Sequence, residues 1–336
     1  MATVRDVAKR AQVSIGTVSR YLNGEKLKPT TQKRVEEAID FLEYRQNYIA
    51  KGLKNNRSLA IGVLINSLKD VFATSVVSSL ETYVEKFGYS IILSDYQSDP
   101  HRLEEKVEFL LKRSIDGLVI FHGENHSSIL KQAVQDSIPI VAIDSPVEKI
   151  KADTVLIDNY DASYQATQRL IEKGLKKIGI IAGQRENFIG RERLRGYKKA
   201  LETNKIAVNN QLIWNGDYSV QSGYEGVNKL LNENSDIDAI FTINYYMTLG
   251  AIKALRQRNI KIGEDIGLIA FDRFEYNDVL TPAITSITQP VEQMGEVAGE
   301  LLVKKISGDS LRTENETVIC NTQLFIGESD KKRLHN

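Results

Sequence analysis

The apolar residues in the first 45 positions recur at the spacing of short amphipathic helices. Three sets show this spacing, in chain order: Val4, Val7, Ala8 and Ala11; Ile15, Val18 and Leu22; Val35, Ala38, Ile39 and Leu42. Thr3 with Asp6 resembles a capping pair before the first helix, and Ser14 has the residue type of a cap for the second. The Asn-Gly pair at 23–24 ends the second helix, and Pro29 suits the first position of the third. We therefore predict three short helices.

From residue 59 onward, short apolar runs alternate with helical patterns. The runs are predicted strands over 59–65, 90–94, 117–121, 139–143, 177–182, 238–243 and 266–271. Helices are predicted near 72–87, 102–113, 127–136, 160–173, 190–204, 219–232, 246–258 and 290–306. Short apolar strands with intervening helices are typical of parallel sheets covered on both faces. Seven strands over about 270 residues indicate two such units rather than one.

The predicted fold is therefore α/β, with a helical head, a hinge and two doubly wound parallel-sheet subdomains. The head spans 1–46, and a short polar segment, 47–58, links it to the rest. A break near Asp158-Asn159 separates the subdomains, and later strands are expected to cross back. The N-terminal subdomain is assigned residues 59–158 and 289–317, and the C-terminal subdomain residues 159–288 and 318–330.

Charge is distributed unevenly along a chain whose 336 residues have a net charge of zero. Residues 1–58 hold twelve Lys and Arg against six Asp and Glu, so they carry +6 and the rest carries −6. A basic end on an acidic body suggests a nucleic-acid-binding head. The single cysteine excludes an intrachain disulfide, and we expect a cytoplasmic protein without signal peptide or membrane span.

Three short helices with a tight turn between the first two are typical of a helix-turn-helix, whose second helix enters the DNA major groove. The cap Ser14 leaves helix N–H donors to face phosphate. Gly16 lets the backbone approach DNA closely, although glycine costs about 1 kcal/mol of helix propensity. Arg20 is placed to reach a guanine edge or a phosphate. The alternative is a solvated helical bundle without a ligand.

At this point the sequence resembles the LacI/GalR family of bacterial transcription repressors. The resemblance begins with TVRDVAKRAQVSIGTVSRYLNG and KRVEEAIDFLEYRQNYIAKGL. It continues through GYSIIL, DGLVIF, IPIVAID, DNYDASYQA, GDYSVQSGY and LTPAITSITQP, and it covers essentially residues 2–329.

The resemblance implies a set of DNA-binding residues. Positions that touch phosphates are Thr3, Ser14, Thr17, Ser19, Asn23 and Tyr44. Positions that read bases are Ile15, Gly16 and Arg20. The segment Asn47 to Asn56 is similar to the family's hinge helix, in which Ala50 faces the minor groove and Leu53 is the apolar wedge that bends the duplex.

Candidate ligand residues follow the predicted strands, because ligands of parallel sheets bind at the carboxyl ends of the strands. The candidates are Phe72, Asp95, Asp144, Arg193, Tyr218, Asn244 and Asp272. The resemblance implies that Arg193, Asn244 and Asp272 bind ligand hydroxyls and that Tyr218 packs on the ligand. A sugar suits this set, since an aromatic face covers the apolar side of a pyranose. Alternatively, Arg193 and Asp272 form an ion pair, and Tyr218 belongs to the core.

Other chemistry finds less support in the sequence. The run His122-Gly-Glu124-Asn-His126 offers two imidazoles and one carboxylate without a fourth ligand, so a loop is favoured over a metal site. Neither a P-loop, nor a Gly-x-Ser-x-Gly elbow, nor a dinucleotide fingerprint follows the first strand, and we predict no enzyme activity and no cofactor.

These observations predict a homodimeric repressor that binds a near-palindromic operator in double-stranded DNA and responds to a small effector, a carbohydrate. The symmetry of the protein should match that of its site. By resemblance, the helix near 72–87 lies at the dimer interface. The alternative is a global catabolite regulator of the same fold, controlled by a phosphorylated carrier protein. Outside this class, a solute-binding protein or sugar-metabolising enzyme is the remaining alternative, which the head and hinge disfavour.

Overall fold

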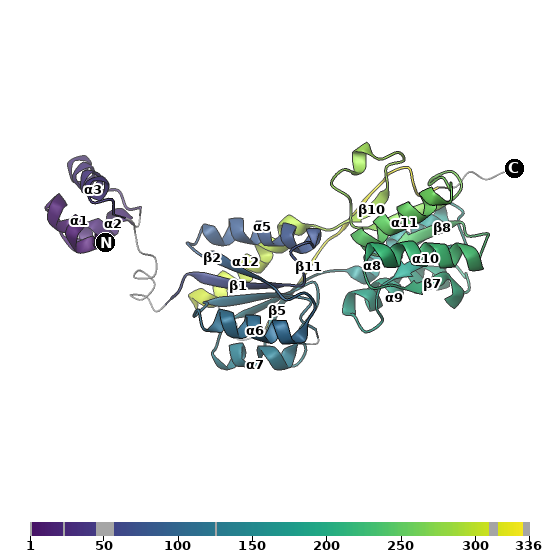
Figure 1. Ribbon diagram of the computed structural model, residues 1–336, viewed down its shortest axis with the longest axis horizontal. Helices are drawn as coiled ribbons and strands as arrows, with labels where there is room; N and C mark the ends of the chain where they lie inside the picture. The colour runs from purple at the N-terminus through teal and green to yellow at the C-terminus, as the bar shows by residue number, and fades with distance from the viewer. Residues whose placement is uncertain (1, 23, 45–56, 125, 309–314, 332–336) are drawn as a thin grey trace. The chain divides into compact units, whose positions relative to one another are not determined.

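A computed structural model describes residues 2–22, 24–44, 57–124, 126–308 and 315–331 of the chain. The chain divides into two compact units, Met1–Leu59 and Ala60–Asn336, and each is described by itself (Figure 1). Within the described residues, no helix is both long and apolar enough to cross a bilayer.

The first unit is a bundle of three helices, α1 (Val4–Ala11), α2 (Ile15–Leu22) and α3 (Pro29–Phe41), as the apolar spacing predicts. Its buried core consists of Val7, Ala8, Ala11, Val18, Val35 and Ala38. The capping pair is confirmed, because Thr3 and Asp6 bond reciprocally at the start of α1. Gln12 ends α1 in the left-handed conformation, which makes the tight turn, and Pro29 occupies the first turn of α3.

The second unit begins with a six-stranded sheet of order β11-β5-β4-β3-β1-β2, in which every pair is parallel. Its strands are β1 (Ala60–Ile65), β2 (Ser90–Asp95), β3 (Gly117–Phe121), β4 (Ile140–Ile143), β5 (Asp153–Ile157) and β11 (Thr317–Cys320). Its helices are α5 (Val71–Glu85), α6 (Pro100–Leu111), α7 (Ser127–Gln135) and α12 (Val291–Ser307). Helix α5 packs with α12 and α6 with α7, so the sheet is covered on both faces (Figure 1).

The remaining strands form a second sheet of order β12-β10-β9-β8-β6-β7, which is parallel except for β12. These strands are β6 (Ile178–Ala182), β7 (Ile213–Asn215), β8 (Ala239–Thr242), β9 (Gly267–Phe271), β10 (Thr285–Thr288) and β12 (Gln323–Phe325). The helices that pack on it are α8 (Asn159–Glu172), α9 (Phe188–Thr203), α10 (Val220–Glu233) and α11 (Tyr245–Gln257), with short 3-10 turns at Asn210–Leu212 and Asn277–Val279.

The chain passes between the two sheets three times. It leaves the first sheet after β5, returns after β10 to form α12 and β11, and leaves again for β12. The sequence analysis placed the first two boundaries at 158–159 and 288–289, and the first two passages follow Ile157 and Thr288. The third differs, because β11 pairs with β5 and keeps residues up to Cys320 in the first sheet, whereas the prediction assigned 318 onward to the second subdomain.

Candidate effector site and DNA-binding helix

Helix α2 exposes the side predicted to read bases and buries the opposite side. Ile15, Gly16 and Arg20 are exposed, and Val18 is fully buried against α1 and α3. The Ser14 Oγ atom accepts a hydrogen bond from the Thr17 backbone N–H at 3.1 Å, so Ser14 caps the helix as predicted. The exposed side of α2 is therefore available to a partner without any change in the core of the bundle.

The other residues predicted to contact DNA differ in how exposed and how bonded their side chains are. The Thr3 hydroxyl lies 2.7 Å from Asp6 Oδ2, and these bonds lower the pKa of Asp6. Tyr44 is partly buried against the core of the bundle, and burial raises the pKa of its hydroxyl. Ser19 is half-buried. The candidates Asn23, Asn47, Ala50 and Leu53 lie outside the described residues.

In the second unit, three predicted ligand residues and His122 stand after strands and share an unusual backbone conformation. Asp144 follows β4 with φ of 71°, and Asp272 follows β9 with φ of 73°. His122 follows β3 with φ of 52°, and Tyr218 has φ of 67°. Positive φ is uncommon for residues other than glycine and concentrates at functional sites. The strained positions therefore mark the same ends of the sheets that the topology favours for a ligand.

Arg193 is a buried cation at the centre of this region. It projects from α9 and is 3% exposed. Its Nε donates to Asn159 Oδ1 at 2.7 Å, its Nη1 donates to the Ile243 carbonyl, and its guanidinium lies 3.4 Å from the centre of the Phe271 ring. Burial lowers the pKa of Arg193, while the charges of Asp272 and Asp144 oppose that shift. The two carboxylates thus help to keep a buried guanidinium charged.

Asp272 is held by protein groups rather than by an ion pair with Arg193. Its Oδ2 accepts from the Tyr245 N–H at 3.0 Å, and its Oδ1 accepts from Gln289 Nε2 at 2.6 Å. Burial raises the pKa of Asp272, and the charge of Arg193 lowers it. Among the described residues Arg193 and Asp272 form no salt bridge with each other, so this conformation does not contain the ion pair given as the alternative.

Five buried polar atoms in this region have no hydrogen-bond partner in the described part of the chain. They are His122 Nδ1, Asp144 Oδ1, Asn159 Nδ2, Tyr218 Oη and Gln289 Oε1. His122 Nδ1 lies 3.6 Å from Asp144 Oδ2, and burial raises the pKa of Asp144 against the charges of His122 and Arg193. We name these five residues with Arg193 and Asp272 the Arg193 cluster. Buried polar atoms are normally paired, so this set of free donors and acceptors can bind a hydroxyl-rich molecule.

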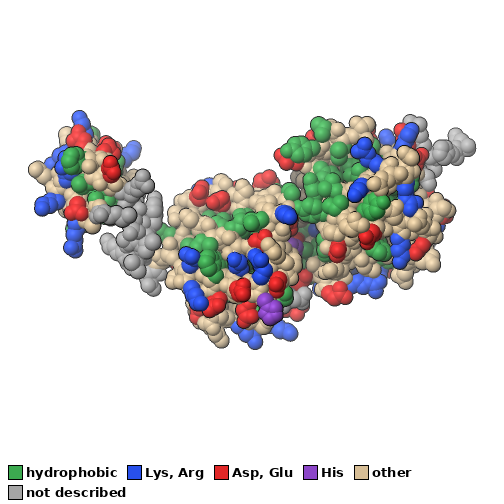
Figure 2. Space-filling view, viewed as in Figure 1, with side chains coloured by type: hydrophobic (Ala, Val, Ile, Leu, Met, Phe, Trp, Pro, Cys, Tyr) green, Lys and Arg blue, Asp and Glu red, His purple; other side chains and the backbone are tan. Residues whose placement is uncertain are grey.

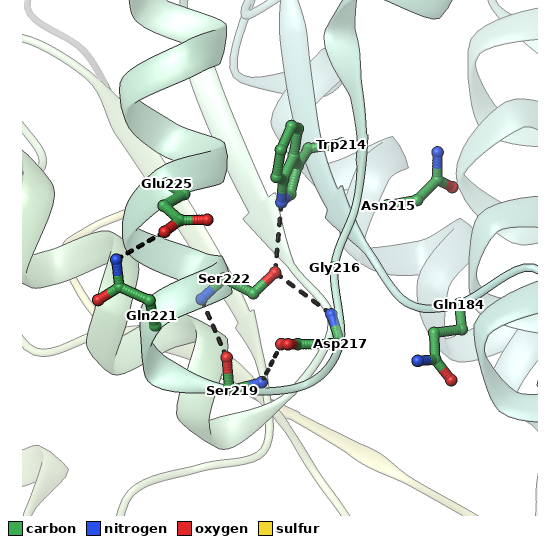
Figure 3. Close-up of a pocket in the computed structure, with 9 residues that line it drawn as sticks. All are labelled: Gln184, Trp214, Asn215, Gly216, Asp217, Ser219, Gln221, Ser222 and Glu225. Carbon is green, nitrogen blue, oxygen red and sulfur yellow. Dashed lines mark hydrogen bonds between the residues drawn. The ribbon is translucent and has the colours of Figure 1, made fainter.

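A network of hydrogen bonds joins the residues on either side of Tyr218, Asp217 and Ser219, to Ser222 and to each other (Figure 3). Asp217 N–H donates to Ser222 Oγ at 3.2 Å, and Ser219 N–H donates to Asp217 Oδ1 at 3.0 Å, on either side of Tyr218. Trp214 Nε1 also donates to Ser222 Oγ, at 3.3 Å. These residues line a cavity of about 310 Å³ that none of the predicted ligand residues lines. The cavity therefore lies beside the turn that carries Tyr218.

Tyr218 itself reaches the start of α9 from this turn. Its hydroxyl lies where a Cβ on Gly183 or on Gly190 would be, at 2.2 and 2.9 Å from the two ideal positions. Burial raises the pKa of Tyr218, so the hydroxyl is protonated and can donate. Tyr218 is only partly buried as a residue, and its hydroxyl is one of the buried polar atoms of this region.

The other three predicted ligand residues have internal roles. Asn244 Oδ1 caps α11 through Met247 N–H at 2.9 Å, and its Nδ2 donates to the Tyr218 carbonyl at 3.1 Å. Asp95 accepts from the Gln97 and Leu68 N–H groups, which braces the loop after β1. Phe72 lies edge-to-face with Phe121, with ring centres 6.4 Å apart.

Sequence reasoning did not include His122, Asn159 and Gln289 among the ligand candidates. Gln289 follows β10, a strand that the sequence analysis did not predict. The search for polar residues at the carboxyl ends of predicted strands, which identified Asp272, therefore could not include Gln289. His122 was assigned to a loop with Glu124 and His126. In the structure Glu124 accepts from Phe188 N–H at 2.8 Å, and His126 packs on the Tyr96 ring at 5.9 Å. The described residues hold no group of three metal-ligand side chains.

Comparison with known proteins agrees with the two units. Residues 3–47 match the family described as bacterial regulatory proteins, lacI family, and residues 58–328 match periplasmic binding proteins and sugar binding domain of LacI family. The chain belongs to the LacI family. It is a transcriptional repressor with a helix-turn-helix DNA-binding head and an effector-controlled core, and its partners are operator DNA and a small molecule.

Three LacI-family relatives illustrate the extent of the match. Catabolite control protein A of Priestia megaterium is 32% identical over 311 residues, 92% of this chain and 94% of that protein. A lac repressor dimer bound to operator and the anti-inducer ONPF has a TM-score of 0.84 and 25% identity, covering 98% and 99% of the two chains. A transcriptional regulator CelR–cellobiose complex has a TM-score of 0.75 and 29% identity, covering 98% and 100%. These relatives are regulators rather than enzymes.

Proposed function

We propose that this LacI-family repressor is controlled by an uncharged sugar that binds to the Arg193 cluster. The observation that carries the proposal is the set of five buried polar atoms without protein partners around a buried guanidinium. Sugar hydroxyls both donate and accept, so one molecule can satisfy Asp144 Oδ1 as well as Tyr218 Oη. The relative solved with cellobiose and the sugar-binding family description support this ligand class.

The sugar is expected to be uncharged because the cluster already holds two carboxylates beside its one guanidinium. Asp144 and Asp272 face Arg193, and His122 is the other basic group of the cluster. A phosphate or carboxylate on the ligand would meet two carboxylates in a buried place, where like charges repel strongly.

In the head, we propose that α2 reads the operator through Arg20 and the apolar contact of Ile15, while Leu53 of the hinge segment bends the duplex. The exposure of Ile15, Gly16 and Arg20 on one side of α2 supports this. A regulator of this kind acts where the chromosome lies, so we place it in the cytoplasm.

We further propose that the repressor is a homodimer. Exposed apolar side chains support this: Leu249 on α11 is 39% exposed, and Val279 in the loop before β10 is 79% exposed. Figure 2 shows hydrophobic side chains gathered over this part of the second unit. A related lac repressor was solved as a dimer on operator. Apolar surface of this kind marks an interface.

Tyr218→Phe tests the ligand assignment, because it removes one of the five polar atoms of the cluster and keeps the aromatic ring. Operator affinity of the full-length protein is measured by fluorescence anisotropy, with and without a panel of mono- and disaccharides that includes cellobiose. At least one sugar should change the operator dissociation constant, and Tyr218→Phe should weaken the affinity for that sugar about tenfold, the scale of one lost hydrogen bond. Tyr276→Phe, at an exposed position, is the matched control.

A second candidate is a catabolite regulator that responds to a phosphorylated carrier protein, which the similarity to catabolite control protein A favours. If no sugar changes operator binding and the phosphorylated carrier protein alone does, this second candidate replaces the first. If Tyr218→Phe and Tyr276→Phe respond equally to the active sugar, the Arg193 cluster is not its site.

A further inference from the structure

A groove along α9 is lined mainly by cations and by none of the residues of the Arg193 cluster. Its volume is about 890 Å³, within the range of small-molecule sites. The lining residues are Tyr160, Arg185, Arg191, Leu194, Arg195, Lys198, Lys199, Glu202 and Asn210. Five of the nine are cationic and one is acidic, although residues 59–336 as a whole carry a net charge of −6. The groove is thus a local positive site on an acidic body.

Three of the cations are held in place by their neighbours. The Arg195 guanidinium lies 4.2 Å above the Tyr160 ring and pairs with Glu192. Arg191 Nη1 donates to the Glu186 carbonyl at 2.9 Å, and Arg185 Nε donates to Asn215 Oδ1 at 3.3 Å. A guanidinium has five N–H donors, so these contacts orient each group and leave donors for a ligand. Such preorganisation lowers the entropy lost on binding.

Much of the positive charge in the groove is not neutralised by protein carboxylates. Within the described residues, Arg185, Arg191 and Lys198 form no salt bridge. Lys199 has only a 4.0 Å contact with the exposed Glu202. Arg191, Arg195 and Lys198 follow the i, i+4, i+7 spacing of one helical face, so their charges point to the same side of α9.

We propose that this groove binds a small anion with two or more linked phosphate groups. The guanidinium fork matches phosphate oxygens bidentately, and lysine adds point charges. The cationic part of α9, from Arg191 to Lys199, is about 12 Å long, which suits a few phosphates rather than a long polymer. A nucleic acid would extend beyond the groove over a surface with an excess of negative charge.

The test uses full-length protein and inorganic pyrophosphate at constant ionic strength. The only tryptophan, Trp214, precedes Asn215, the acceptor of the Arg185 bond, so its fluorescence reports on the core and not on the basic head, and the groove variants show whether the signal comes from the groove. Lys198→Glu with Lys199→Glu is compared with Lys131→Glu with Lys151→Glu, two exposed lysines elsewhere on the core. Both pairs change the net charge by the same amount.

The wild type and the control pair should bind pyrophosphate saturably, and more tightly than sulfate. The groove pair should bind it about tenfold more weakly or not at all. Absence of saturable binding to wild type, or equal weakening in both variant pairs, overturns the proposal. Binding of non-operator DNA that the groove pair loses, without pyrophosphate binding to wild type, assigns the surface to nucleic acid instead and overturns it as well.

Discussion

Four residues that follow strands or lie in turns have backbone conformations that cost free energy. Asp144, Asp272, His122 and Tyr218 all have positive φ, and each such position costs on the order of 1–3 kcal/mol. The cost persists because the surrounding structure constrains each residue, as the Ser222 bonds do on both sides of Tyr218. Residue types alone indicated three of these positions, but no pattern in a sequence of L-residues reports the sign of φ.

Asp144→Asn should make the protein more stable at neutral pH. Burial raises the pKa of Asp144, so the folded state binds its proton more tightly than the unfolded state does. The carboxylate therefore destabilises the fold above the raised pKa, and stability returns as pH falls through that value. The melting temperature of the variant should exceed that of the wild type at pH 7.5, and the difference should shrink towards pH 4.5. A difference that does not change with pH would contradict this.

Gly16→Ala should separate stability from DNA binding in the head. An added Cβ would meet only Ser14 Oγ, at 3.7 Å, so alanine fits and should stabilise α2 by about 1 kcal/mol. If α2 approaches DNA at Gly16, the methyl group should still weaken operator binding. Urea unfolding and fluorescence anisotropy measure the two effects, with a scrambled duplex as the control. A variant that gains stability and keeps its operator affinity would show that the backbone does not approach DNA there.

At the scale of elements, the long helices of both units were predictable and several short strands were not. Helix α12 spans 17 residues with a repeating apolar face, so the helical period can be recognised even where single positions depart from it. Strand β7 has three residues and β12 also has three, too few to establish an alternation. Strand β5 has only three successive apolar residues, Val-Leu-Ile, and its connection from β4 has no helix to mark it as a separate strand.

The missed strands explain most of what sequence reasoning lacked about the site. Gln289 directly follows β10, and its side-chain amide donates a hydrogen bond to Asp272, which directly follows β9. Asn159 was recognised only as part of a break, yet its side chain accepts the Arg193 bond. Both contacts join segments more than 15 residues apart, so they depend on tertiary packing that no local pattern contains.

At the scale of the whole molecule, the proposed dimer gives a direct test of the exposed apolar surface. Val279→Asp should dissociate the dimer, because a charge buried in an interface without a partner is costly. Analytical ultracentrifugation should then show a monomer, and operator affinity should fall by about tenfold or more since two linked heads bind better than one. Phe109→Asp, at an exposed position on α6, is the control. A Val279→Asp protein that stays dimeric would place the interface elsewhere.

The three passages of the chain between the two sheets constrain how the halves of the second unit can move. One connection would permit almost any rotation of one half against the other, whereas three, after Ile157, Thr288 and Cys320, restrict that rotation to one about the passages. Displacement about such an axis is smallest at the passages and grows with distance from them. A small rotation set by a ligand at the Arg193 cluster would therefore displace the far edge of the first sheet more than the residues next to the passages. The displacement that a given rotation produces therefore depends on where the chain crosses between the sheets rather than on any single contact.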